Sequence, residues 1–97
     1  MANRNLFLIV TKYYYDAIAS GMKRTEYRAD TPYWRKRLKP FLNSKDNTVE
    51  FQCGYSRKYP RLKFKFETFC IQQTPESVKK TVKTEYCFAI YFQNRER

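Results

Sequence analysis

The chain has 97 residues, of which 20 are lysine or arginine and nine are acidic, so its formal net charge is +11. This length predicts one domain, residues 1–97, and so large a positive charge predicts a polyanionic partner. The absence of histidine and the presence of only two glycines exclude histidine-dependent nucleophilic triads, P-loops and dinucleotide-binding fingerprints.

The first predicted element is a strand at residues 6–10, an apolar run of strand length that we expect to be covered on both faces. The run is too short for a signal-peptide core or a membrane span, so we expect a cytoplasmic protein without membrane contact. A short helix follows this strand. Its predicted N-cap is Thr11, and Gly21 is predicted to end it in a left-handed conformation.

The segment after this helix is predicted to be extended. In an extended chain Arg24, Glu26 and Arg28 share one face, while Thr25 and Tyr27 share the other. A carboxylate between two guanidinium groups makes charge-assisted hydrogen bonds, and an arginine fork fits a phosphate or a base edge. A solvated surface strand with a local ion pair would show the same pattern.

A second short helix is predicted to begin at Thr31 and Pro32, a typical N-cap followed by a typical first helical residue. Trp34 and Leu38 lie four residues apart on the face that we expect to meet the core, and Pro40 is predicted to close the helix. Residues 48–52 then show the pattern of a strand that leads into a turn.

The strongest period-two pattern runs through residues 61–71, where the apolar phase switches near Glu67 and Thr68. Such a switch predicts a β-bulge, which bends a strand around a barrel. Residues 74–76 fit a helical turn or a loop, and residues 86–92, apolar on both faces, fit a central or partner-covered strand. Together these elements predict an α+β domain, a small mixed β-barrel of five or six strands with two or three short helices.

The three cysteines, Cys53, Cys70 and Cys87, include no C-x-x-C pair, and no histidine can complete a metal site. We therefore expect small buried hydrophobic residues in a reducing compartment, and we expect neither a metal nor a cofactor. The sequence carries no signal for the oligomeric state.

The run of residues 14–28, followed by residues 33–38, resembles the opening of an ASCH domain. The signature of that family, G-x-K-x-x-E-x-R, is present at Gly21, Lys23, Glu26 and Arg28. A second block, residues 51–55 running to residues 60–61, is similar to the strand, glycine turn and return strand of small ASCH proteins. The resemblance implies a stand-alone ASCH-like domain with a PUA-like β-barrel and a cleft for RNA or nucleobases. It also implies, from some small bacterial members, an amidohydrolase that acts on acetylated cytidine.

The positive charge is concentrated in two segments that also carry aromatic residues. Residues 21–39 hold seven basic and two acidic side chains, and residues 57–65 hold five basic and no acidic ones. Aromatic rings interleaved with cations suit the stacking of unpaired bases and the neutralisation of their phosphates. We expect a cleft between residues 23–28 and residues 55–61, with these nucleic-acid-binding candidates: Lys23, Glu26, Tyr27, Arg28, Trp34, Arg35, Tyr55, Arg57, Lys58, Tyr59 and Arg61.

The leading predicted function is recognition of single-stranded RNA, or of a nucleoside with an unpaired or modified base. One alternative is an amidohydrolase acting on acetylated cytidine, or a ribonuclease, with Lys23 and Glu26 as acid–base groups. In the ASCH amidohydrolases a threonine stands three residues after the lysine, a position that is Glu26 here, while Thr25 is expected to face the other side of the strand. A second alternative is a regulatory or inhibitory protein that binds an acidic protein surface.

Overall fold

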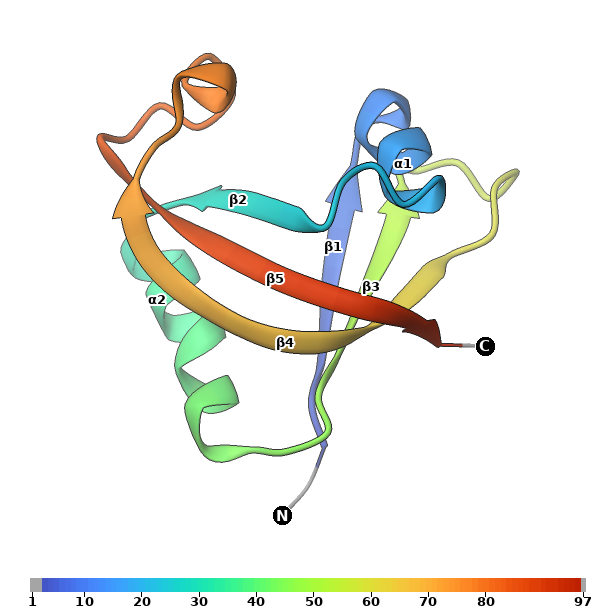
Figure 1. The fold of residues 1–97 in the computed structure, drawn as a ribbon, viewed down its shortest axis with the longest axis horizontal. Helices are drawn as coiled ribbons and strands as arrows, with labels where there is room; N and C mark the ends of the chain where they lie inside the picture. Colours follow the sequence, from blue (N-terminus) through green and yellow to red (C-terminus); the bar gives the residue numbers. More distant parts are fainter. Residues whose placement is uncertain (1–2, 97) are drawn as a thin grey trace.

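The computed structural model describes residues 3–96, of which residues 94–96 are described by their backbone alone. Five strands form one open mixed sheet in the order β1-β3-β4-β5-β2 (Figure 1). The pair β1 and β3 is parallel, and the other pairs are antiparallel. The predicted class is confirmed, because the fold is a small α+β sheet of barrel-like shape. The strands are β1 (Asn5–Val10), β2 (Thr25–Ala29), β3 (Thr48–Cys53), β4 (Leu62–Gln73) and β5 (Tyr86–Glu96).

Two α-helices connect the first three strands, α1 (Lys12–Ala19) and α2 (Pro32–Leu38). The predicted N-caps are confirmed, since the Thr11 and Thr31 side chains accept hydrogen bonds from the amides three residues ahead. Gly21 has a φ of 84° and follows α1, as predicted. Pro40 does not close the helical segment, because the chain continues as a 3-10 helix, η1 (Lys39–Asn43), whose first turn tolerates a proline.

The long strands β4 and β5 curve around the molecule (Figure 1). Their pairing skips a residue between Phe66 and Thr68, so the predicted bulge at Glu67 is confirmed. A second irregularity, between Phe64 and Lys65, had no signal in the sequence. After the bulge Phe69 pairs with Ile90 and the apolar phase returns to the inner face, as the phase switch predicted.

The core prediction holds for β5 and only partly for β1. In β5, residues 87–90 are all buried, as expected for a central strand between β4 and β2. In β1, Leu6 and Leu8 are buried, whereas Phe7 and Ile9 on the outer face are half-buried. The prediction of a strand covered on both faces is therefore wrong for β1. The reason is that β1 is an edge strand whose outer face is covered by long side chains instead of a second layer.

The three cysteines are free thiols. Cys53 and Cys87 are buried, as predicted, but Cys70 is exposed, so the expectation of a buried residue is wrong there. Cys70 follows the bulge and lies on the outer face of β4, where neighbouring Thr68 is exposed as well. Within residues 3–96, no helix combines the length and apolar character that crossing a membrane requires.

The two edge strands of the sheet, β1 and β2, come together and leave a seam between them (Figure 1). Helix α1 connects these strands and covers one end of the seam. One side chain bridges it: Arg28 of β2 donates from Nη2 to the carbonyl oxygen of Ile9 in β1, at 3.1 Å. This seam is where the side chains of the ASCH-like signature converge.

Candidate nucleic-acid interface

Glu26 is a buried carboxylate on the inner face of the sheet. It pairs with Ile90 of β5, a core residue, and Arg28 pairs with Phe88 on the same face. Only 7 % of Glu26 is exposed. A buried charge is costly unless it is paired and hydrogen-bonded, so the partners of Glu26 decide whether the arrangement is stable.

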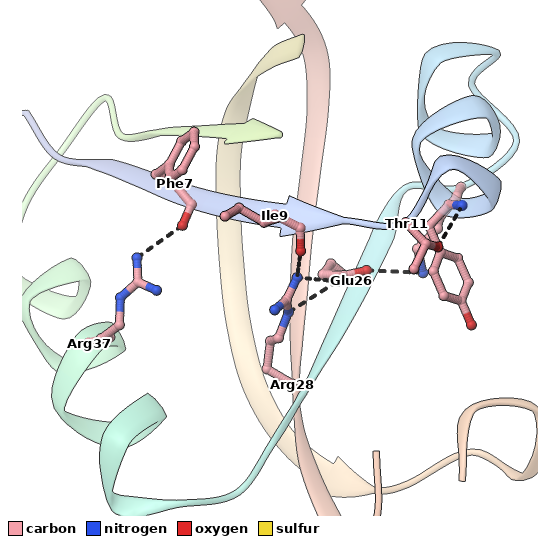
Figure 2. Close-up of polar contacts among 8 residues, drawn as sticks. Phe7, Ile9, Thr11, Glu26, Arg28 and Arg37 are labelled. Atoms are coloured by element: carbon pink, nitrogen blue, oxygen red, sulfur yellow. Dashed lines mark hydrogen bonds and ion pairs between the residues drawn. The ribbon is translucent and has the colours of Figure 1, made fainter. Parts of the chain in front are cut away.

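Two cations satisfy that carboxylate. Arg28 donates from Nε and Nη2 to Glu26 Oε2 at 3.1 and 2.8 Å, and Lys23 Nζ lies 3.4 Å from Oε1. Figure 2 shows the Arg28 guanidinium reaching both Glu26 and the Ile9 carbonyl. The sequence placed the carboxylate between Arg24 and Arg28, but Lys23 takes the place expected of Arg24. Arg24 precedes β2 and lines a different hollow, of about 220 Å³, at the end of α1.

A cavity of about 280 Å³ opens onto this ion network. Its walls come from β1, α1, β2, α2 and the segment of residues 74–85 that follows β4. We call it the seam cavity, and it is lined by Ile9, Val10, Thr11, Tyr14, Glu26, Tyr27, Arg28, Ala29, Trp34, Thr81 and Val82. Pockets for drug-sized ligands span about 300–1,000 Å³, so this one has room for a single base and not for a large cofactor.

Aromatic rings surround the two cations. Lys23 Nζ lies 5.0 Å from the ring centre of Tyr14 and 5.3 Å from that of Tyr27. The Arg28 guanidinium lies 5.1 Å from the ring centre of Trp34. Burial raises the pKa of the Tyr27 phenol, with a smaller contribution from Cys87. These contacts hold Arg28 at the wall of the seam cavity and Lys23 in a small adjoining hollow that shares Tyr14, Glu26 and Tyr27 with it. The surrounding rings are an apolar environment, which strengthens hydrogen bonds.

The second predicted segment lies elsewhere. Tyr55, Arg57, Tyr59 and Arg61 line a separate, open hollow of about 620 Å³ that contains no residue of β2. The expectation of one cleft between residues 23–28 and 55–61 is therefore wrong. Helix α1 stands between the two segments (Figure 1). From this helix the Tyr15 hydroxyl donates a hydrogen bond to the Pro60 carbonyl, and the Tyr15 ring packs at a tilt against that of Tyr59.

The candidate residues beside that second hollow differ in how exposed they are and in how many contacts hold them. Tyr55 is 88 % exposed, and Arg57 and Lys58 are exposed beside it. Tyr59 is half-buried against the core and lies 4.9 Å below the Lys12 ammonium group. Arg61 is 3.7 Å from a carboxylate oxygen of Glu50 and stacks on Phe7.

Arg35 has a structural role in the described residues. Its Nε and Nη2 donate to the two carboxylate oxygens of Asp30 at 2.7 and 3.0 Å. The hydrogen bond from Arg35 holds the pKa of the Asp30 carboxyl below its usual value. Arg35 does not line the seam cavity, so the structure separates it from Lys23, Glu26, Tyr27, Arg28 and Trp34, which the cavity and its ion network bring together.

Sequence reasoning missed the walls formed by α1 and by residues 74–85. The sequence predicts Thr11 only as an N-cap and gives no signal that Tyr14, Thr81 or Val82 lines a cavity. The 74–85 segment is closed by Thr74, which donates from Oγ1 to the Thr84 carbonyl at 2.6 Å and from its amide to the Glu85 carbonyl. No local pattern in the sequence predicts that residues 74–85 pack beside the seam.

Among the side chains that the structure describes, those of residues 3–93, no group of three or more cysteine, aspartate and glutamate residues is placed to hold a metal ion. Compared with models of known protein families, with curated proteins and with solved structures, the chain matches none. The likeness to ASCH domains thus stays a prediction that depends on the signature residues themselves.

Proposed function

We propose that this protein binds single-stranded RNA by taking an unpaired base into the seam cavity. The observation that supports this most strongly is the placement of Glu26. A buried carboxylate with two cationic partners lies at the wall of a base-sized cavity instead of within the packed core. An ion pair needed only for the fold would not require an opening beside it.

The functional groups at the cavity match the edge of a base. Glu26 offers carboxylate oxygens to amino and imino hydrogens, while Lys23 and Arg28 offer donors to carbonyl and ring-nitrogen acceptors. The hydroxyl groups of Thr11 and Thr81 can serve in either sense. A base must leave its stack to present this edge, so the ligand is an unpaired base.

The charge of the whole chain supports a polyanion. A net charge of +11 far exceeds what solubility needs, and phosphate contacts supply most of the affinity in nucleic-acid complexes. The cavity then supplies selectivity that a diffuse cationic surface lacks.

Fluorescence anisotropy with labelled single-stranded RNA tests the proposal. Lys23→Ala is expected to weaken binding about tenfold or more, because a hydrogen bond to a charged group contributes about 1.5–3 kcal/mol. The matched control is Lys39→Ala, an exposed lysine of equal charge at the start of η1, which is expected to cost less than about twofold. Equal losses, with both variants folded by circular dichroism, would show that the cavity is not the site.

A second candidate, the amidohydrolase, rests on Glu26 at the wall of the seam cavity and on Lys23 in the hollow that adjoins it. A lysine and a carboxylate 3.4 Å apart can exchange a proton with a bound substrate. Thr25 pairs with Tyr91 on the outer face, so the nearest threonine hydroxyls at the cavity are those of Thr11 and Thr81. Acetate release from acetylated cytidine is the direct assay. Release that Glu26→Gln abolishes while RNA binding persists would favour the enzyme.

A further inference from the structure

We infer, building on the proposed RNA binding, that the seam cavity is the first of three sites along a track, so that the ligand is a strand of at least three nucleotides and not a free nucleoside. The track runs from the seam across the outer face of β1 to the hollow beside residues 55–61.

The second site directly adjoins the first. A hollow of about 390 Å³ shares Ile9, Arg28 and Trp34 with the seam cavity and extends along the open edge of β1 to Arg37. Two hollows that share three wall residues can hold two consecutive units of one ligand. Tyr33, which is 62 % exposed, forms the outer rim of the second one.

Arg37 supplies the second cation. Its Nη2 donates to the Phe7 carbonyl at 3.1 Å (Figure 2). Its guanidinium lies 4.9 Å from the ring centre of Trp34 and 5.7 Å from that of Tyr33. Within the described part of the chain no carboxylate pairs with Arg37, so its charge is uncompensated. Its Nη1 also donates a long hydrogen bond to the Tyr33 hydroxyl, at 3.5 Å, and the guanidinium hydrogens not used in these two bonds are available to a phosphate.

Strand β1 sets the spacing between the Arg28 and Arg37 guanidinium groups. Arg28 and Arg37 are hydrogen-bonded to the carbonyls of Ile9 and Phe7, two residues apart on one strand edge. That separation is about 6–7 Å along a strand. The same two hydrogen bonds occupy the edge carbonyls that an added β-strand would need, so this edge is unsuited to a partner strand.

The third site continues from Phe7. The Arg61 guanidinium lies 4.8 Å from the Phe7 ring centre, and Arg61 also lines the hollow that contains Tyr55 and Tyr59. Cations and rings therefore alternate from the seam to the 55–61 segment. This alternation is the pattern by which proteins hold the backbone and stack the bases of single strands.

The test is a competition series. A labelled hexaribonucleotide of randomised sequence is displaced by unlabelled mono-, di-, tri- and hexanucleotides of randomised sequence. Affinity is expected to rise about fivefold or more with each nucleotide up to three, since each stacked base adds substantially. A hexanucleotide no tighter than a mononucleotide would overturn the track while leaving the seam site in place. If neither binds, the proposed function itself fails.

Single substitutions test whether the proposed track passes Tyr33 and Arg37. Tyr33→Ala and Arg37→Gln are each expected to lower the ratio of hexanucleotide to mononucleotide affinity about fivefold or more. Their controls are Tyr13→Ala, a tyrosine 77 % exposed on α1, and Lys36→Gln, an exposed neighbour on α2. Tyr33 is exposed at the surface, so its variant tests the track even if Arg37→Gln fails to fold. A ratio that falls no more than in the controls would contradict the assignment.

Discussion

Glu26 contributes both to the stability of the fold and to the proposed binding site. Its carboxylate ties β2 to the Lys23 turn and, through Arg28, to the edge of β1. Removing one partner from a buried ion pair costs about 3–5 kcal/mol because it leaves a charge without compensation. Lys23 and Arg28 keep 15 % and 21 % of their side chains exposed, so water can relieve part of that penalty.

The substitution Glu26→Gln keeps the shape and removes the negative charge. It is expected to lower the free energy of unfolding by about 1–3 kcal/mol, less than for a fully buried pair. Affinity for a phosphate chain should hold or rise, because net positive charge increases, while preference among the four bases should relax. Thermal melting and competition among four homopolymeric RNAs measure the two effects.

Glu67→Gln is the control of equal charge change for this prediction. Glu67 is an exposed glutamate at the bulge of β4, and it lines neither the seam cavity nor the two hollows of the track. It should leave base preference unchanged. A base preference that survives Glu26→Gln would remove Glu26 from base recognition.

At the level of the elements, β5 carries a titratable group within the sheet. Burial raises the pKa of the Cys87 thiol and is the largest of the influences on that pKa. The pKa of this thiol is therefore higher in the folded state than its unfolded value of about 8.5. Below about pH 8.5 the thiol's full contribution to the free energy of unfolding is present. It is lost as the pH rises toward the folded-state pKa. Tyr27, whose pKa burial also raises, acts in the same direction above about pH 10.

Urea unfolding at pH 7.5, 8.5 and 9.5 is therefore expected to show falling stability. A Cys87→Ala variant should be less stable at pH 7.5 because of the space it leaves, yet show a smaller loss between pH 7.5 and 9.5. Cys70→Ala, at an exposed position, should keep the slope of the parent protein. Identical slopes in all three proteins would refute the assignment to Cys87.

The elements that could be predicted are those with local signals. Thr11 and Thr31 announce the starts of α1 and α2, and the phase switch at Glu67 announces the bulge. The extent of outer-face cover on β1 was not predictable, because it depends on a side chain such as Arg61, more than fifty residues away along the chain. Exposure of Cys70 follows instead from its place after the bulge, where Phe69 packs against the core and the neighbouring Cys70 faces outward.

One part of the candidate site could be predicted from the sequence, and another part could not. The spacing of Glu26 and Arg28 predicted one ion pair of the network, because both residues lie on one face of the same strand. The second partner is Lys23 instead of the expected Arg24. The second wall could not be inferred, since Thr81 reaches the seam through tertiary packing of the 74–85 segment. The basic and aromatic segments suggested a cleft shared with residues 55–61, whereas α1 separates the two hollows.

On the scale of the whole molecule, the net charge of +11 makes salt dependence a direct measure of phosphate contacts. Four contacts with single-stranded RNA predict a slope of about −3 in log affinity against log salt concentration, from about −0.7 per contact. Anisotropy titrations at several sodium chloride concentrations give this slope. A slope near zero would contradict a polyanionic ligand.

The central claim is that the seam cavity receives a base, and nuclear magnetic resonance tests it without any substitution. A ¹⁵N-labelled sample is titrated with a hexaribonucleotide at about 0.15 M salt, where long-range attraction is screened within about 8 Å. Saturable shifts are predicted for the amides of Thr11, Glu26 and Thr81 and for the Trp34 indole. The amides of residues 39–45, at the far end of α2, should not move (Figure 1). Shifts of equal size in both groups, or shifts confined to residues 39–45, would contradict the account.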